Sequence, residues 1–137
     1  MPKKTILIVG TYDTKNEELE YISDTIVSMG GNVLKMDVSV LGEAKGKTDF
    51  SKHTVAEAAG KSIKTAIESG SEHIAMNIMS EGASNLASTL HSKGKFDGII
   101  LLGGTMGTDL ALDVCKDLPL GLPKYVVSTV SFSPIIT

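Results

Sequence analysis

The sequence has few of the residues that mark disulfide-rich, nucleic-acid-binding or membrane-spanning proteins. Its single cysteine, Cys115, excludes an internal disulfide framework and a zinc site made of several cysteines. Lys and Arg number 13 against 16 Asp and Glu, a formal net charge of −3, so no basic surplus favours general nucleic-acid binding. No apolar run approaches the roughly 20 residues that span a bilayer, and the apolar stretch after MPKK is too short for a signal peptide. We therefore expect a soluble, cytoplasmic domain.

What is present suffices for one folded domain with a substantial core. The chain has 137 residues, of which 42% are hydrophobic, and it carries neither a heptad repeat nor a Gly-X-Y repeat. We find no internal linker and no low-complexity segment, so residues 1–137 are expected to form a single domain.

Short runs that are apolar on both faces alternate with helical patterns. Such runs, at residues 5–9 and 99–102, are typical of parallel strands buried under helices, and residues 32–38 and 124–130 are predicted as two further strands. Apolar spacing and helix start and stop signals predict helices at residues 14–29, 54–67 and 72–91, and a short one after residue 108. The alternation predicts an α/β fold: a doubly wound, Rossmann-like parallel sheet of about four strands in the order 2-1-3-4, with helices on both faces.

Local signals refine these helices. Thr14 with Glu17, and Thr54 with Glu57, have the spacing of capping boxes, in which two side chains satisfy free amide groups at a helix start. Gly82 lies within the apolar stripe of the third helix, which indicates close packing against a neighbour. Residues 39–50 show no periodicity and are expected to form a loop that is long enough to take part in binding.

In a sheet of this order, ligands bind in the crevice between the first and third strands, at their carboxyl ends. Two glycine- or hydroxyl-rich loops should begin there, at residues 10–15 and 103–108. The second loop has neutral donors and one nearby acid, so its amides suit a phosphate better than those of the first loop. The sequence thus predicts that phosphate is held by Gly103, Gly104, Thr105, Gly107 and Thr108.

The first loop is expected to form the opposite wall of this crevice, through Gly10, Thr11, Asp13 and Lys15. Asp13 could bind a magnesium ion, bind a ribose hydroxyl or act as a structural cap. Lys15 could neutralise part of the charge of a phosphate. Asp37, at the end of the second strand, lies where an acid that binds ribose would lie, although a structural cap is the alternative.

Several chemistries lack support. Neither loop reads G-x-x-x-x-G-K-[ST] or G-x-G-x-x-G, and Gly103-Gly104 could equally form a turn that lets a helix pack on the sheet. The three histidines are widely separated, which argues against a metal site. Cys115 fits a core position better than a nucleophile. Lys45, Lys47 and Lys52 make the long loop locally basic, which suits either recruitment of a polyanionic ligand or, more commonly, a solvated loop. No catalytic residue can be named, so enzymatic activity stays open.

Five blocks of sequence, in this order, resemble one family. They are GTYDTKNEE at residues 10–18, MDV at 36–38, LGGTMGT at 102–108, PLGLPK at 119–124 and VSTV at 127–130. The family is that of the tomato mosaic virus resistance protein, which is described as having an ATP-binding domain. The resemblance implies that the chain corresponds to the first Rossmann-like half of a longer, two-lobed protein and that its ligand is ATP.

The expected function is therefore binding of a nucleotide, ATP, with or without magnesium, at the crevice. The alternatives are an enzyme that acts on a small phosphorylated or carboxylated metabolite and an interaction module without a ligand. A homo-oligomer, such as a dimer, or a second half of the protein is expected to cover exposed apolar surface, including the apolar residues 131–137.

Overall fold

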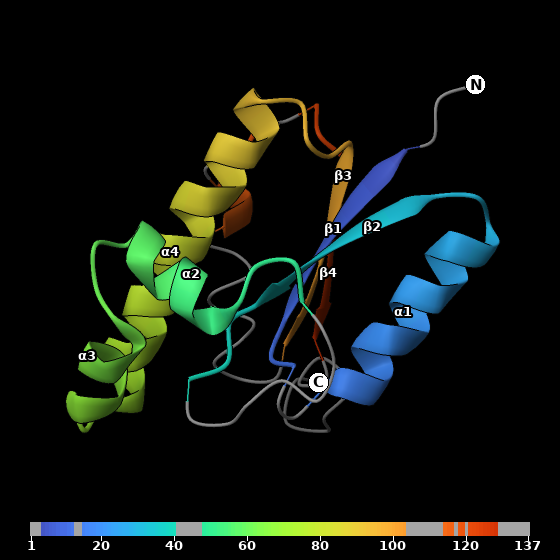
Figure 1. Ribbon diagram of the computed structural model, residues 1–137. Helices are drawn as coiled ribbons and strands as arrows, with labels where there is room; N and C mark the ends of the chain where they lie inside the picture. The colour runs from blue at the N-terminus through green and yellow to red at the C-terminus, as the bar shows by residue number, and fades with distance from the viewer. Residues whose placement is uncertain are drawn as a thin grey trace, which may run out of the picture.

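The computed structural model describes residues 4–12, 15–40, 48–103, 114–116, 118–119 and 121–128. Four parallel strands form one sheet in the order β2-β1-β3-β4 (Figure 1). The strands are β1 (Thr5–Gly10), β2 (Asn32–Asp37), β3 (Gly98–Gly103) and β4 (Lys124–Ser128). The predicted α/β class, the four strands and their order are confirmed.

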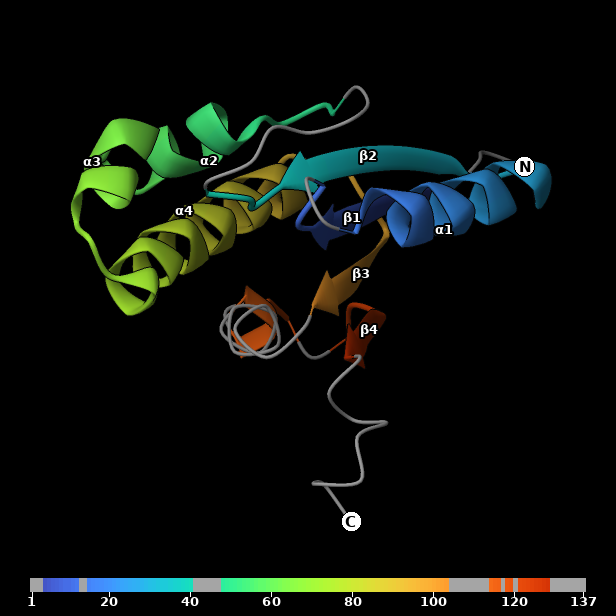
Figure 2. The same ribbon diagram turned by 90° about the horizontal axis from the view of Figure 1, so that it is seen from below.

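Helices cover both faces of the sheet. Helix α1 (Asn16–Ser28) lies on one face, whereas α2 (Lys52–Ala58), α3 (Ile63–Glu68) and α4 (Glu72–Ser92) lie on the other (Figures 1 and 2). The cause is the handedness of parallel crossovers. The connections from β1 to β2 and from β2 to β3 run in opposite directions across the sheet, so right-handed crossovers place their helices on opposite faces.

The core is divided by the sheet into two apolar clusters of unequal size. The larger cluster lies on the side of α2 and α4, where alternate strand residues such as Val9 and Leu101 meet helix residues such as Met79. The smaller cluster lies on the side of α1 and consists of Ile8, Tyr12, Leu19 and Leu102, with partly buried residues packed against it. Because successive strand residues point to opposite faces, β1, β2 and β3 each contribute to both clusters.

Gly82 packs as its place in the apolar stripe predicts. A Cβ atom at Gly82 would lie 1.9 Å from the carbonyl oxygen of Val55, on α2. The backbones of α2 and α4 therefore cross so closely that no side chain fits between them.

The prediction of one helix at residues 54–67 is wrong, because the structure contains two helices in this region. Helix α2 begins at Lys52, after Ser51, whose side chain accepts a hydrogen bond from the amide of Thr54. Gly60 has a φ of +76°, which ends α2, and Ser62 then caps α3. The apolar spacing continues through this break, so periodicity alone could not show it.

The start of α1 also differs from the expected capping box. Lys15 is the N-cap of α1, and its side chain makes no capping hydrogen bond to the described residues. The residue expected in that role, Thr14, lies outside the described residues.

The end of the loop expected at residues 39–50 is paired with the sheet. The amides of Asp49 and Phe50 both donate to the carbonyl of Lys35, and the carbonyl of Phe50 accepts from the amide of Asp37. These bonds lie along the outer edge of β2. Residues 41–47 are outside the described part of the chain.

The segment before β4 contains a helical turn at residues 114–116, where the predicted short helix falls. Val114 is fully buried in the larger cluster, and Cys115 packs partly buried against it. The apolar residues 131–137 lie outside the described residues. Within the described ranges, no helix is long and apolar enough to cross a membrane.

Candidate functional site at the carboxyl edge of the sheet

The two loops predicted to form the site begin at neighbouring positions. Gly10, the last residue of β1, pairs in register with Leu102 on one side and with Asp37 on the other. Gly103 follows Leu102 directly and pairs with Ser128 at the end of β4. From β1 the chain adds β2 on one side and then β3 and β4 on the other, so the carboxyl ends of β1 and β3 form the switch point at which α/β sheets bind ligands.

Gly10 is required by the packing of α1 on the sheet. A Cβ atom there would lie 2.7 Å from one methyl group of Leu19 and 3.3 Å from the carbonyl oxygen of Leu102. Leu19 is fully buried, so it has little room to move away. The glycine therefore lets the first helix approach the end of β1, which sets the position of the loop between them.

Asp37 ties this loop to the end of β2. Its Oδ1 atom accepts hydrogen bonds from the amide of Tyr12 at 3.3 Å and from the amide of Ser39 at 2.9 Å, and the hydroxyl of Ser39 donates to the same atom. The Asp37 side chain is buried, at 2% exposure. The structural cap that the sequence offers as an alternative for Asp37 is present in the structure.

The remaining predicted site residues divide into described and undescribed ones. Thr11 is half-buried, and its carbonyl accepts a hydrogen bond from the amide of Lys15 at 2.8 Å. Lys15 is half-buried at the helix start, and Gly103 ends β3. The positions of Asp13, Gly104, Thr105, Gly107 and Thr108 lie outside the described residues, so their assignment to magnesium and phosphate stays a prediction.

Tyr12 is a residue of this loop that the sequence did not single out. Its side chain is fully buried against Ile8, Leu19 and Leu102, and its hydroxyl has no hydrogen-bond partner within the described part of the chain. Burial raises the pKa of this phenol above its ordinary value, and the negative charges of Glu20, Asp37 and Asp49 raise it further. The Tyr12 hydroxyl therefore stays protonated well above neutral pH.

Asn16, the first residue of α1, has a second buried atom of this kind. Its Oδ1 has no hydrogen-bond partner within the same described ranges. A buried polar atom without a partner costs about 1–3 kcal/mol, so such atoms point to strain or to a missing polar group. No sequence signal reveals this, because burial of a side-chain atom depends on the tertiary packing.

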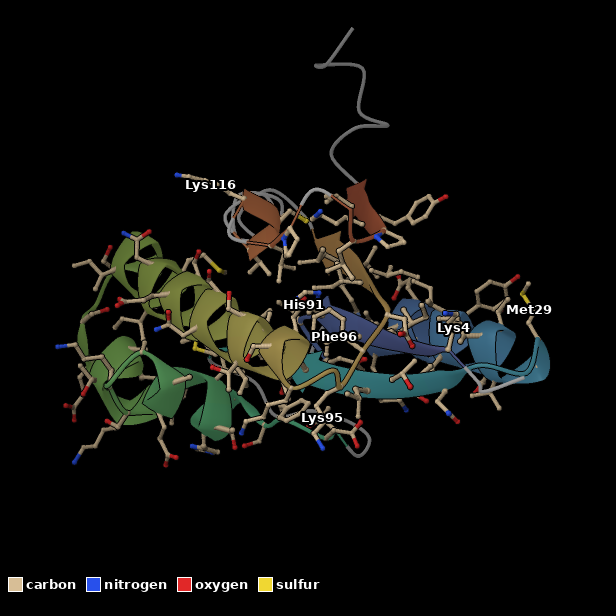
Figure 3. The ribbon with its side chains drawn as sticks, turned by 90° about the horizontal axis from the view of Figure 1, so that it is seen from above. Lys4, Met29, His91, Lys95, Phe96 and Lys116 are labelled. Atoms are coloured by element: carbon tan, nitrogen blue, oxygen red, sulfur yellow. The ribbon has the colours of Figure 1, made fainter. Side chains whose placement is uncertain are left out.

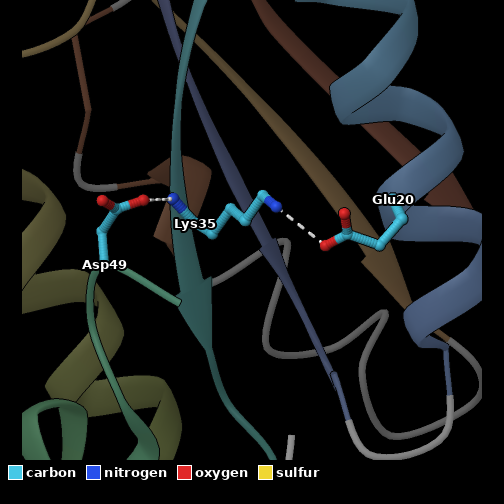
Figure 4. A network of polar contacts seen from close by, with 3 residues as sticks. All are labelled: Glu20, Lys35 and Asp49. Atoms are coloured by element: carbon cyan, nitrogen blue, oxygen red, sulfur yellow. Dashed lines mark hydrogen bonds and ion pairs between the residues drawn. The ribbon is translucent and has the colours of Figure 1, made fainter. Parts of the chain in front are cut away.

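A short polar network borders Tyr12 at the outer strand β2. The ammonium group of Lys35 contacts Glu20 Oε1 at 2.8 Å, and the backbone amide of Lys35 donates to Asp49 Oδ2 at 2.8 Å (Figure 4). The ion-paired side chains are 19% and 35% exposed, so the pair contributes at most about 1 kcal/mol. Its effect is to hold α1 to β2 beside the loop.

Lys52 differs from the solvated loop residue that was expected. It lies in the first turn of α2, is 4% exposed, and its ammonium group donates to the carbonyl of Val40 at 3.3 Å. Lysine is almost never so fully buried unless its charge has partners. Lys52 therefore holds the segment that follows β2 rather than forming part of a mobile basic loop.

His91 and Cys115 lie outside this edge. His91, at the end of α4, is half-buried and meets the ring of Phe96 edge-on, with ring centroids 5.8 Å apart (Figure 3). This contact lies at the amino end of β3, away from the carboxyl ends of the strands. Burial raises the pKa of the Cys115 thiol, which fits a packing role. Among the described residues, no cluster of histidine, cysteine and acidic side chains could hold a metal ion.

These observations define a class: a doubly wound α/β domain whose switch-point edge carries a glycine-terminated first strand and a loop fixed by a buried aspartate. Residues 4–136 match the model of the "Uncharacterised protein family (UPF0261) N-terminal domain". The chain belongs to this family.

Relatives from bacteria and a plant cover the same region. The chain is 49% identical over 131 residues to a UPF0261 protein of Brucella suis and 38% identical over 128 residues to one of Clostridium tetani. It is 28% identical over 146 residues to the ToMV resistance protein Tm-1 of Solanum lycopersicum. These matches cover 96%, 93% and 92% of this chain but 31%, 32% and 19% of the relatives, so the chain spans about a third of its bacterial relatives. The resemblance seen in the sequence is confirmed.

Proposed function

We propose that this domain binds a nucleotide, ATP, in the crevice between the carboxyl ends of β1 and β3. The observation that carries the proposal is the register of β1 and β3, in which Gly10 stands opposite Leu102 and next to the start of the glycine-rich loop at Gly103. Amides at such a loop attract phosphate, and glycine lets an anion approach the backbone closely.

In this proposal the two walls of the crevice have different tasks. Residues 103–108 hold the phosphates, with Thr105 and Thr108 as neutral donors. Lys15 neutralises part of the phosphate charge, Thr11 lines the same wall, and Asp13 holds magnesium. Asp37 reaches the ribose and keeps the Gly10 loop in place through its bonds to Tyr12 and Ser39.

Isothermal titration of the 137-residue chain with ATP and magnesium tests the proposal, with ADP, a sugar phosphate and inorganic phosphate as comparisons. We expect ATP to bind at least about tenfold more tightly than inorganic phosphate, a difference of about 1.4 kcal/mol. Equal affinities for ATP and inorganic phosphate would overturn the proposal that the ligand is a nucleotide. Binding of the sugar phosphate in preference to ATP would instead favour an enzyme of small phosphorylated metabolites.

A pair of glycine variants tests the location. Gly104→Asp places a carboxylate in the proposed phosphate loop and should abolish ATP binding. Gly121→Asp is the matched control, because a Cβ atom at Gly121 meets no atom within 4 Å and the residue is exposed. If both variants fold and bind ATP like the parent, the loop is not the phosphate site.

A further inference from the structure

A row of paired residues crosses the sheet on the face that α1 covers. It runs from Lys35 on β2 through Ile8 on β1 and Ile100 on β3 to Tyr125 on β4. Ile8 is fully buried, Ile100 is half-buried and Tyr125 is 69% exposed. Helix α1 packs on β1 and β2, so its cover ends halfway across the sheet (Figure 2).

The two outer strands are protected to different degrees. The outer edge of β2 is paired with Asp49 and Phe50. Strand β4 pairs only with β3 within the described ranges, and it exposes Tyr125 on one face and Val126, at 38%, on the other. A free edge with exposed aromatic and β-branched side chains is a template for pairing with another strand.

No outward-pointing charge on the described part of β4 prevents another strand from pairing with its outer edge. Lys124 is the one charged residue of β4, and its ammonium group donates to the carbonyls of Pro119 and Leu122, the second at 3.0 Å. The lysine is thus turned back onto its own loop. Exposed edges in monomeric proteins commonly carry outward charges, prolines or bulges, and the described part of β4 has no such device.

We propose that β4 is an interior strand of a larger sheet in this family. A parallel strand from the polypeptide outside the matched region pairs with the outer edge of β4, and a helix that follows this strand returns over the other face to cover Tyr125 and Ile100 beside α1. The inference does not depend on nucleotide binding.

Two observations select this occupant. The chain accounts for 31% of the length of the Brucella suis relative, so ample polypeptide exists beyond this domain in the family. In addition, β3 and β4, the last two strands in the chain, were each added in parallel on the same side of β1. Because β3 already occupies the inner side of β4, a further strand beside β4 falls at its outer edge.

Hydrogen exchange measured by mass spectrometry compares the 137-residue chain with the full-length Brucella suis protein. We expect the segment that aligns with β4 to exchange about tenfold or more slowly in the longer protein, because its outward amides are then hydrogen-bonded. The interior strand β1 is the internal reference and should exchange alike in both proteins. Equal exchange of the β4 segment in both would overturn the proposal.

A second copy of the chain is the competing occupant, and sedimentation identifies it. Both proteins are measured at the concentrations used for hydrogen exchange, together with the variants Tyr125→Lys and Tyr21→Lys. Tyr21 is 73% exposed on α1 and serves as the matched control. A monomer that shows the difference in exchange supports the proposal. A dimer that Tyr125→Lys dissociates and Tyr21→Lys leaves intact would assign the edge to a second copy and overturn it.

Discussion

The two faces of the sheet are packed in different ways. On the side of α2 and α4, a large cluster contains fully buried apolar residues such as Val55, Ala83 and Met79, and helix backbones touch at Gly82. On the side of α1, the cluster is small, and buried polar groups of Tyr12 and Asp37 lie within or beside it.

This contrast separates the region that stabilises the fold from the region that forms the candidate site. Apolar burial and close packing stabilise the side of α2 and α4, because burying apolar surface is the dominant favourable term in folding. The side of α1 contains the hydrogen bonds that position the loop after β1. Changes on the first side should therefore act on the free energy of unfolding, and changes on the second should act on the loop.

The largest effect is expected from Gly82→Ala. The new Cβ atom would lie 1.9 Å from a backbone oxygen, so α2 and α4 must separate, at a cost of about 3 kcal/mol or more. Urea unfolding measures this loss. Gly121→Ala, in open space, is the control and should change the free energy of unfolding by less than about 0.5 kcal/mol. A stable Gly82→Ala variant would show that the helices are not in such close contact.

A smaller effect, concentrated on the loop, is expected from Asp37→Ala. The substitution removes the acceptor of the Tyr12 and Ser39 amides and should cost about 2 kcal/mol. Hydrogen exchange at residues 10–12 should rise more than exchange in α4. Asp97→Ala is the control, because Asp97 accepts one amide, that of Thr5, at the exposed opposite end of β1. Uniformly faster exchange across the domain would contradict a specific role for Asp37 in the loop.

The smallest effect at neutral pH is expected from Tyr12→Phe, which removes a buried hydroxyl without a hydrogen-bond partner in the described structure. The free energy of unfolding should change by less than about 1 kcal/mol at pH 7, or even increase. The raised pKa of Tyr12 has a further consequence. Above about pH 10 the unfolded chain loses this proton while the folded protein keeps it, so the parent loses stability relative to the variant.

Urea titrations of parent and variant between neutral pH and about pH 11 measure this difference. Tyr21→Phe is the matched control, since it removes the same hydroxyl from a ring that is 73% exposed. Parallel curves for the parent and Tyr12→Phe over this whole range would show that the phenol is not held in its neutral form.

Much of the fold could be predicted because its signals are local. Residues 5–9 and 99–102 are apolar at every position apart from Thr5, which indicates buried parallel strands, and both form interior strands of the sheet. The close packing at Gly82 could be predicted because a glycine within an apolar helical stripe indicates that another element approaches the backbone there. The break between α2 and α3 was missed, because Gly60 and Ser62 interrupt the helix without interrupting its apolar spacing.

The candidate site could be predicted less completely. The sequence placed Gly10, Asp37 and Gly103 at one edge of the sheet, and the strand register confirms that they are neighbours there. It did not indicate Tyr12 or the burial of Lys52. Nothing in the residues around Tyr12 or Lys52 distinguishes a side chain that is enclosed by other elements from one that meets solvent.

Patterns along the chain were enough to predict the strands and their alternation with helices, because periodicity acts between neighbours in sequence. The strand order was predicted from the doubly wound type that this alternation indicates. Three features came from the assembled fold alone: the identity of the buried polar groups, the role of Asp37 in holding the Gly10 loop, and the contrast between a covered β2 and a β4 that presents Tyr125. Burial of a side chain and pairing of a strand depend on contacts between segments that are distant in sequence, and local sequence patterns do not reveal such contacts.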